Sequence, residues 1–150
     1  MRTLKTMMIA LALCTAVSFT PAFAQSADQT VSGIIEKWSA AFNKLDADGL
    51  ASLYSRNALF YGSTPPLYKG KEGVAAYFNA LPRWKSPTVQ FSDLATVPIG
   101  SDLINVAGTA TFVISDTAPP VTFRLTWVLM REDGEWKIIS HHVSPKPAPH

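Results

Sequence analysis

The N-terminal half of the chain carries its apolar residues at helical spacing. One stripe repeats at i, i+3, i+4 and i+7 intervals, and it predicts an amphipathic helix of about 16 residues. The stripe consists of Val31, Ile34, Ile35, Trp38, Phe42 and Leu45.

Three shorter elements are expected before the middle of the chain. Asp46 is a suitable N-cap for a short helix. That helix would carry Leu50, Leu53 and Tyr54 on one side. The segment 57–62 predicts a brief strand that ends at a glycine, and 63–70 predicts a loop. A third helix is expected from about Lys71 until Pro82, whose ring cannot continue a helix.

The hydrophobic period changes to two in the C-terminal half. Four segments alternate as strands do: 88–97, 103–115, 121–132 and 135–144. They are separated by the turn-forming stretches "PIGSD", "DTAPP" and "DG". Helices followed by an antiparallel sheet indicate an α+β fold in which the helices pack on one sheet face.

The last hairpin can be assigned a register. If Asp133 and Gly134 form a two-residue type I′ turn, Glu132 lies opposite Glu135. One face then carries Phe123, Leu125, Trp127, Leu129, Trp136, Ile138, Ser140, His142 and Ser144. This face is the more apolar one, so it is expected to meet the helices, with His142 pointing inward and His141 outward. A longer turn or a bulge would exchange the two faces.

The opposite face of the same hairpin is too apolar to be explained by contact with water alone. A face of this kind suggests a partner, most simply a second copy of the chain. The expected homodimer interface comprises Arg124, Thr126, Val128, Met130, Ile139 and His141.

The first 24 residues are typical of a cleaved signal peptide. Arg2 and Lys5 precede the apolar run "MMIALALCTAV", and "AFA" at 22–24 is a small-x-small cleavage site. The expected location is therefore periplasmic or secreted. A membrane anchor is the alternative, although Pro21 disfavours it. Lipidation of Cys14 is another alternative, but Leu13 stands where a small residue is expected.

Removal of this segment changes the composition. Lys+Arg falls from 13 to 11 on loss of Arg2 and Lys5, against 11 Asp+Glu, so the mature formal charge is zero. No basic block suggests nucleic acid, and no membrane association is expected after cleavage. The mature chain has no cysteine. One domain is expected over 25–144, followed by a flexible Pro-rich tail, 145–150.

Three segments carry a resemblance to a known family: "IIEKWSAAFNKLDADGLASLYSRNALFYG", "GKEGVAAYF" and "RLTWVLMREDGEWKIISHHVS". The chain resembles the nuclear transport factor 2-like superfamily, in its SnoaL-like and calcium/calmodulin-dependent kinase II association-domain branch. The resemblance implies a cone-shaped half-barrel, with N-terminal helices packed on a curved, mostly antiparallel sheet. It also implies an internal pocket and, commonly, a homodimer formed through the outer sheet face. The fold hosts both enzymes and binding proteins, so it does not by itself assign a function.

The resemblance excludes one chemistry. Ketosteroid isomerase-like members take a proton with an aspartate just after the first strand, and the matching position here is Gly62. Glycine cannot abstract a proton, so steroid isomerisation is not expected. No pair of carboxylates is recognisably placed for acid–base catalysis.

His142 is the best single candidate for chemistry because it is expected beside Ser140 and Ser144 on the inner face. It could be catalytic, it could contact a ligand, or it could be a core histidine bonded to a hydroxyl. Adjacent strand residues point apart, so His141 and His142 cannot share a metal ion. Neither a metal nor another cofactor is expected.

The expected ligand-binding residues are Trp38, Tyr54, Tyr61, Trp127, Ser140 and His142. Two function classes remain open. The first is a module that binds a small apolar or aromatic molecule without turnover. The second is a cofactor-independent isomerase, lyase or cyclase that uses His142 with Tyr54 or Tyr61 for proton transfer.

Overall fold

The computed structural model describes residues 26–146. The expected signal peptide, with Cys14 and the cleavage site, lies outside the described residues, as do the last four residues of the tail. Among the described residues, no helix is long and apolar enough to cross a membrane.

The expected helices and strands are present, but some ends differ: Leu45 lies beyond the first helix, and Leu53 and Tyr54 are not on the second helix, because Leu53 is its C-cap and Tyr54 begins the first strand. The elements are α1 (Ala27–Asn43), α2 (Ala47–Ser52), β1 (Tyr54–Tyr61), β2 (Leu67–Lys69), α3 (Gly70–Ala80), β3 (Thr88–Ile99), β4 (Leu103–Val113), β5 (Val121–Glu132) and β6 (Glu135–Pro145). Asp46 caps α2 as expected, because its side chain accepts a hydrogen bond from the Gly49 amide at 2.9 Å. The short strand β2 lies inside the segment expected to be a loop.

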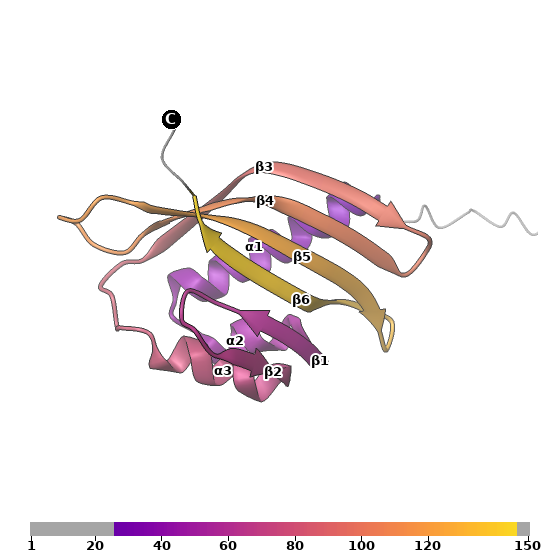
Figure 1. Ribbon diagram of the computed structural model, residues 1–150, viewed down its shortest axis with the longest axis horizontal. Coiled ribbons are helices and arrows are strands. Elements are labelled where there is room, and N and C mark those ends of the chain that lie inside the picture. Colours follow the sequence, from indigo (N-terminus) through magenta and orange to yellow (C-terminus); the bar gives the residue numbers. More distant parts are fainter. Residues whose placement is uncertain (1–25, 147–150) are drawn as a thin grey trace, which may run out of the picture.

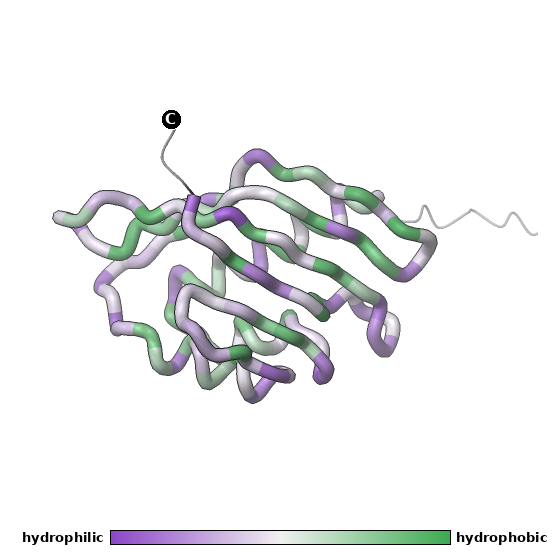
Figure 2. The backbone as a smooth tube through the Cα atoms, in the orientation of Figure 1, coloured by the Kyte–Doolittle hydropathy of each residue, from purple (hydrophilic) through white to green (hydrophobic). Residues whose placement is uncertain are grey.

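The six strands form one curved sheet in the order β2-β1-β6-β5-β4-β3. All neighbours are antiparallel except β1 and β6, which run parallel. Figure 1 shows α1 running behind the sheet and α3 beside β1 and β2 at the lower edge. Hydrophobic and hydrophilic residues alternate along the strands (Figure 2), so each strand has one face suited to the core. The fold is therefore the expected α+β half-barrel.

The core lies between α1, α3 and the inner sheet face. The apolar stripe of α1 is buried at Val31, Ile34, Trp38 and Phe42. On β5, Leu125, Trp127 and Leu129 are at most 3% exposed. The sequence pattern therefore identified the inner face of β5 correctly.

The register expected for β6 is wrong beyond its middle. Next to the turn, Glu132 pairs with Glu135 and Leu129 with Ile138, as expected, and the turn residues have positive φ. Val128 then pairs with Ser140, which leaves Ile139 as an extra residue, a β-bulge. Every later residue of β6 is consequently turned to the other face.

The bulge exchanges the two histidines. His141 pairs with Trp127 and is only 5% exposed, whereas His142 pairs with Thr126 and is exposed. Val143 likewise turns inward, and Ser140 is exposed. The assignment of His142 to the core and of His141 to the outer face is therefore reversed. The physical reason is that side chains alternate between the two faces of a strand. One inserted residue therefore moves every later side chain to the opposite face.

A buried carboxylate ties the β5–β6 turn to the start of β1. Glu132 is 8% exposed and accepts a hydrogen bond from the hydroxyl of fully buried Ser55 at 2.5 Å. The amide of Arg56 also donates to it, at 3.4 Å. The hydrogen bond from Ser55 is the main cause that lowers the pKa of Glu132 below its ordinary value.

We expect the substitution Glu132→Gln to reduce stability at neutral pH. The pKa of Glu132 is lower in the folded than in the unfolded chain, so ionisation favours folding above the ordinary carboxyl pKa. That contribution is lost as the pH falls through the depressed folded value. Urea unfolding should show a lower midpoint for the variant at pH 7 and a difference that narrows below about pH 4. The control is Glu36→Gln on the exposed side of α1; equal effects of both would contradict the role of Glu132.

Candidate functional site

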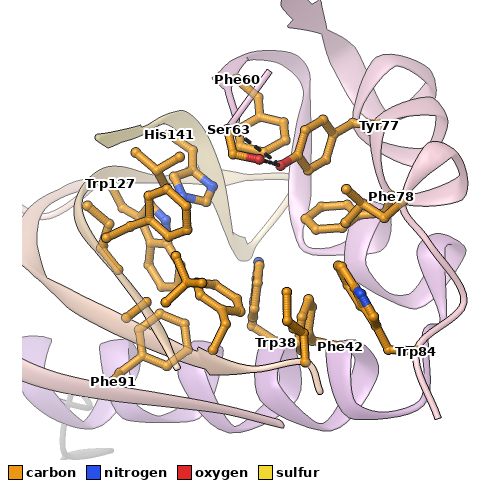
Figure 3. Close-up of a pocket in the computed structure, with 18 residues that line it drawn as sticks. Trp38, Phe42, Phe60, Ser63, Tyr77, Phe78, Trp84, Phe91, Trp127 and His141 are labelled. Atoms are coloured by element: carbon orange, nitrogen blue, oxygen red, sulfur yellow. Dashed lines mark hydrogen bonds between the residues drawn. The ribbon is translucent and has the colours of Figure 1, made fainter. Parts of the chain in front are cut away.

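A cavity of about 240 Å³ lies between the inner sheet face, α1 and α3. Figure 3 shows its walls, with side chains from both helices and from most strands pointing toward one another. The lining residues are Trp38, Phe42, Phe60, Ser63, Tyr77, Phe78, Leu81, Trp84, Phe91, Ala110, Phe112, Ile114, Val121, Phe123, Leu125, Trp127, His141 and Val143. None of these side chains is an Asp, Glu, Lys or Arg.

The cavity wall is mostly aromatic. Trp38 of α1 stacks on Phe42 with ring centroids 5.4 Å apart, and it meets Phe78 and Phe91 edge to face at 5.7 and 5.6 Å. Such offset and edge-to-face contacts hold large rings in fixed orientations. The cavity is therefore bounded by packed side chains from several elements and is not a gap between loops.

A chain of hydrogen bonds runs through one wall of the cavity. The indole N–H of Trp38 donates to the hydroxyl of Tyr54 at 3.2 Å, and that hydroxyl is 2.7 Å from His141 Nδ1. All three residues are buried. The His141 ring also stacks on Phe60, with centroids 4.7 Å apart. The imidazole is thus held in one orientation by its hydrogen bond and by its aromatic neighbours.

Burial determines the charge state of this chain. Desolvation, and secondarily the neighbouring His142, lowers the pKa of His141 to about 3. Burial likewise raises the pKa of Tyr54 above its ordinary value. Both groups are therefore neutral across the physiological range. Between about pH 6.5 and pH 3 the unfolded chain takes up a proton at His141 that the folded chain does not, so this group lowers stability as the pH falls.

A second polar pair lies next to the end of β1, where the Phe60 ring contacts both Tyr77 and His141. The hydroxyl of Tyr77 accepts a hydrogen bond from the Ser63 amide at 3.1 Å and lies 2.9 Å from the Ser63 hydroxyl. Gly62 makes this arrangement possible, because a Cβ at this position would overlap the Tyr77 ring. The position matched to the catalytic aspartate of ketosteroid isomerase-like proteins is thus closed to any side chain while Tyr77 stays in place.

The structure brings together only part of the expected ligand-binding set. Trp38 and Trp127 line the cavity, and Tyr54 lies behind the wall and reaches it through His141. Tyr61, Ser140 and His142 are exposed, and the rings of Tyr61 and His142 meet each other at 5.9 Å away from the cavity lining. His142 therefore has no place in a proton-transfer site inside the cavity.

Sequence reasoning missed several residues of the wall. His141 was assigned to the outer face because no bulge was included in the register. The sequence does contain a signal for the bulge. If Ile139 is skipped, one face of the strand carries the less polar set and the other face the more polar set; the sets are Ile138, His141 and Val143, and Ser140, His142 and Ser144. Phe60 and Tyr77 were recognised as strand and helix residues but could not be placed together, since they belong to separate elements.

The expected interface residues other than His141 lie on the outer face of the sheet. Arg124 and Thr126 are exposed, and Val128, Met130 and Ile139 are half-buried. Leu59, Val97 and Ile99 add exposed apolar side chains on other strands. Within residues 26–146, no cluster of three or more His, Cys, Asp or Glu side chains is placed to hold a metal ion.

The fold and its cavity define a class of protein. In this class helices pack on a curved sheet to form a half-barrel, and the residues that line the cavity can vary. The model of the SnoaL-like domain family matches residues 31–149, and the chain belongs to this family. No curated protein sequence matches the chain significantly.

Solved structures share the fold. A protein from Xanthomonas campestris assigned as a calcium/calmodulin dependent protein kinase II association domain is 25% identical, with a TM-score of 0.71, over 79% of this chain and 87% of that one. A nuclear transport factor 2-like protein of unknown function from Pseudomonas putida KT2440 is 20% identical, with a TM-score of 0.68, over 81% of this chain and 89% of that one.

We expect the substitution Gly62→Ala to destabilise the protein by about 1–3 kcal/mol, because the added methyl group must displace the Tyr77 ring. In a Tyr77→Ala background the same substitution should cost less, since no ring then opposes it. Gly33→Ala is the control: a Cβ there meets nothing within 4 Å, and α1 should gain about 0.5–1 kcal/mol. Chemical denaturation measures all four variants, and equal costs of Gly62→Ala in both backgrounds would contradict the proposed overlap.

Proposed function

We propose that this protein binds a small, largely apolar molecule in the cavity, without chemical turnover. The cavity volume of about 240 Å³ and the aromatic wall support this proposal. A cavity of this size is slightly below the usual range for ligand pockets, about 300–1,000 Å³, and suits a compact ligand. Apolar lining with a few polar groups is the usual composition of such sites.

The protonation properties of the cavity favour binding over catalysis. Efficient general acids and bases have pKa values near the working pH. Burial lowers the pKa of His141 to about 3 and raises the pKa of Tyr54 above its ordinary value. The imidazole is then a weak base and the phenol a weak acid. No carboxylate lines the cavity within the described residues to correct either value.

A cofactor-independent isomerase, lyase or cyclase is the second candidate. The 2.7 Å contact between Tyr54 and His141 beside the cavity favours it, because the two groups are already within proton-transfer distance. In this version His141 takes the place expected for His142. The shifted pKa values make this candidate the weaker of the two.

We further propose that the protein is a homodimer that pairs through the outer sheet face. Ile99, Leu103 and Met130 lie side by side across β3, β4 and β5 on this face. Leu59 and Val97 are further exposed apolar residues of the same face, each separated from Val128 by one polar residue. A patch that spans several strands is larger than isolated exposed residues on a monomer require. A second copy supplies a complementary surface of identical composition.

We expect the substitution Val121→Trp to block the cavity. Val121 lines the cavity and is 40% exposed, so a larger side chain can close the entrance without a buried clash. The affinity for N-phenyl-1-naphthylamine, an uncharged dye that fluoresces in apolar sites, should fall by roughly tenfold or more. Val113→Trp is the matched control, because Val113 is 41% exposed and does not line the cavity. Failure of the dye to bind the wild-type protein would contradict the proposed ligand binding.

The substitution Val128→Glu is expected to produce monomers, because a twofold interface would bury two unpaired carboxylates. Native mass spectrometry of the wild type and the variant measures the subunit number. Ala40→Glu, on the exposed side of α1, adds the same charge away from the sheet and should leave the dimer intact. A monomeric wild-type protein would contradict the assembly but not the binding of a ligand.

A further inference from the structure

The hydrogen bonds of the cavity wall determine which nitrogen of His141 carries the proton. An indole N–H can only donate, so Tyr54 accepts from Trp38 at 3.2 Å. The hydroxyl proton of Tyr54 then has one available acceptor among the described residues, His141 Nδ1 at 2.7 Å. If Tyr54 donates there, the ring proton of the neutral imidazole resides on Nε2.

The opposite arrangement leaves a buried donor without a partner. If His141 Nδ1 carried the proton, Tyr54 would accept two hydrogen bonds, and its own O–H would have nothing to donate to within the described residues. Tyr54 is fully buried, so water cannot satisfy that group. An unsatisfied buried donor is more costly than an ordinary hydrogen bond is favourable. The Nε2–H tautomer satisfies all three groups and is therefore preferred.

The Nε2–H group is available to a ligand. Among residues 26–146 no hydrogen bond reaches Nε2, and it is not among the sealed polar atoms without a partner, which are Thr30 Oγ1 and Trp127 Nε1. His141 lines the cavity, so Nε2 is reached from there. Figure 3 shows the imidazole at the cavity wall beside Trp127.

The free hydrogen-bonding atom of the wall beside Tyr54 is a donor, the Nε2–H of His141. The indole N–H of Trp127, whose ring centroid is 5.4 Å from that of His141, also lacks an acceptor, but it is buried and does not reach the cavity. A ligand hydroxyl could accept from Nε2–H, but its own proton would then need an acceptor, and the hydroxyls that line the cavity, those of Ser63 and Tyr77, already bond to each other. A ligand carboxylate would be desolvated beside a neutral imidazole, with no Lys or Arg in the lining. An uncharged carbonyl oxygen accepts and needs no partner of its own.

We propose that the cavity takes an uncharged aromatic carbonyl compound, whose oxygen accepts a hydrogen bond from the Nε2–H of His141. This proposal rests on the ligand-binding function proposed above. The aromatic walls supply the apolar contact, and one donor orients the molecule.

Three naphthalenes of nearly equal shape test the proposal by displacement of N-phenyl-1-naphthylamine. They are 2-acetylnaphthalene, 2-isopropenylnaphthalene, which replaces the carbonyl oxygen by a methylene group, and 2-naphthoate. The ketone should bind roughly five- to tenfold more tightly than the alkene, as one hydrogen bond predicts, and the carboxylate least tightly. Equal binding of ketone and alkene would overturn this proposal and leave the proposed function standing. Failure of the dye and of all three compounds to bind would overturn both.

In the variant His141→Phe the ratio of ketone affinity to alkene affinity, each measured relative to the variant's own dye affinity, should fall to about one. A preference that persists in this variant would overturn the proposal. If the variant does not fold, nitrogen-15 NMR of the wild-type imidazole gives an independent answer, because protonated and unprotonated ring nitrogens have distinct shifts. A proton on Nε2, with Nδ1 bare, supports the proposal; the reverse tautomer overturns it.

Discussion

A single extra residue in β6 determines which side chains of this strand face the interior of the domain. The bulge at Ile139 turns His141 toward the helices and His142 toward the outer face. It thereby places an imidazole where Tyr54 can hold it at 2.7 Å, and it brings Val143 to the cavity wall. Without the bulge, the inner face of β6 would carry Ser140 and His142. The polarity of the cavity and the position of the His141 Nε2–H donor both depend on this insertion.

The bulge brings His141 to Tyr54 only because of the order of the strands in the sheet. The parallel pairing of β1 with β6 brings Tyr54, from the first half of the chain, beside the first half of the last strand, where Tyr54 pairs with Ile138. The α1 helix contributes Trp38 from behind the sheet, so the hydrogen-bond chain joins three elements that are distant in sequence. A buried polar chain of this kind is stable because each member has a partner. The aromatic residues around it keep water away, which also explains why both ionisable members remain neutral.

The resemblance to ketosteroid isomerase-like proteins implies a catalytic position that this chain does not fill. Gly62 stands where the resemblance places a catalytic aspartate, and the Tyr77 ring occupies the space that a side chain there would need. The cavity is consequently lined by aromatic and aliphatic groups, together with the paired hydroxyls of Ser63 and Tyr77 and the imidazole of His141. This composition suits recognition of an uncharged molecule better than proton transfer.

The sequence by itself determined the order and bounds of most elements, the inner face of α1 and β5, and the cap at Asp46, because each depends on periodicity or on neighbouring residues. The β5–β6 turn was predictable for the same reason: Asp133 and Gly134 have the local chemistry of a tight turn. Only the tertiary structure decided which histidine faces inward, because a bulge with no glycine or proline to mark it is selected by the pairing of β6 with β5 and β1. The meeting of Trp38, Tyr54 and His141 was likewise decided in three dimensions, since contacts between distant segments leave no periodic signal in the chain.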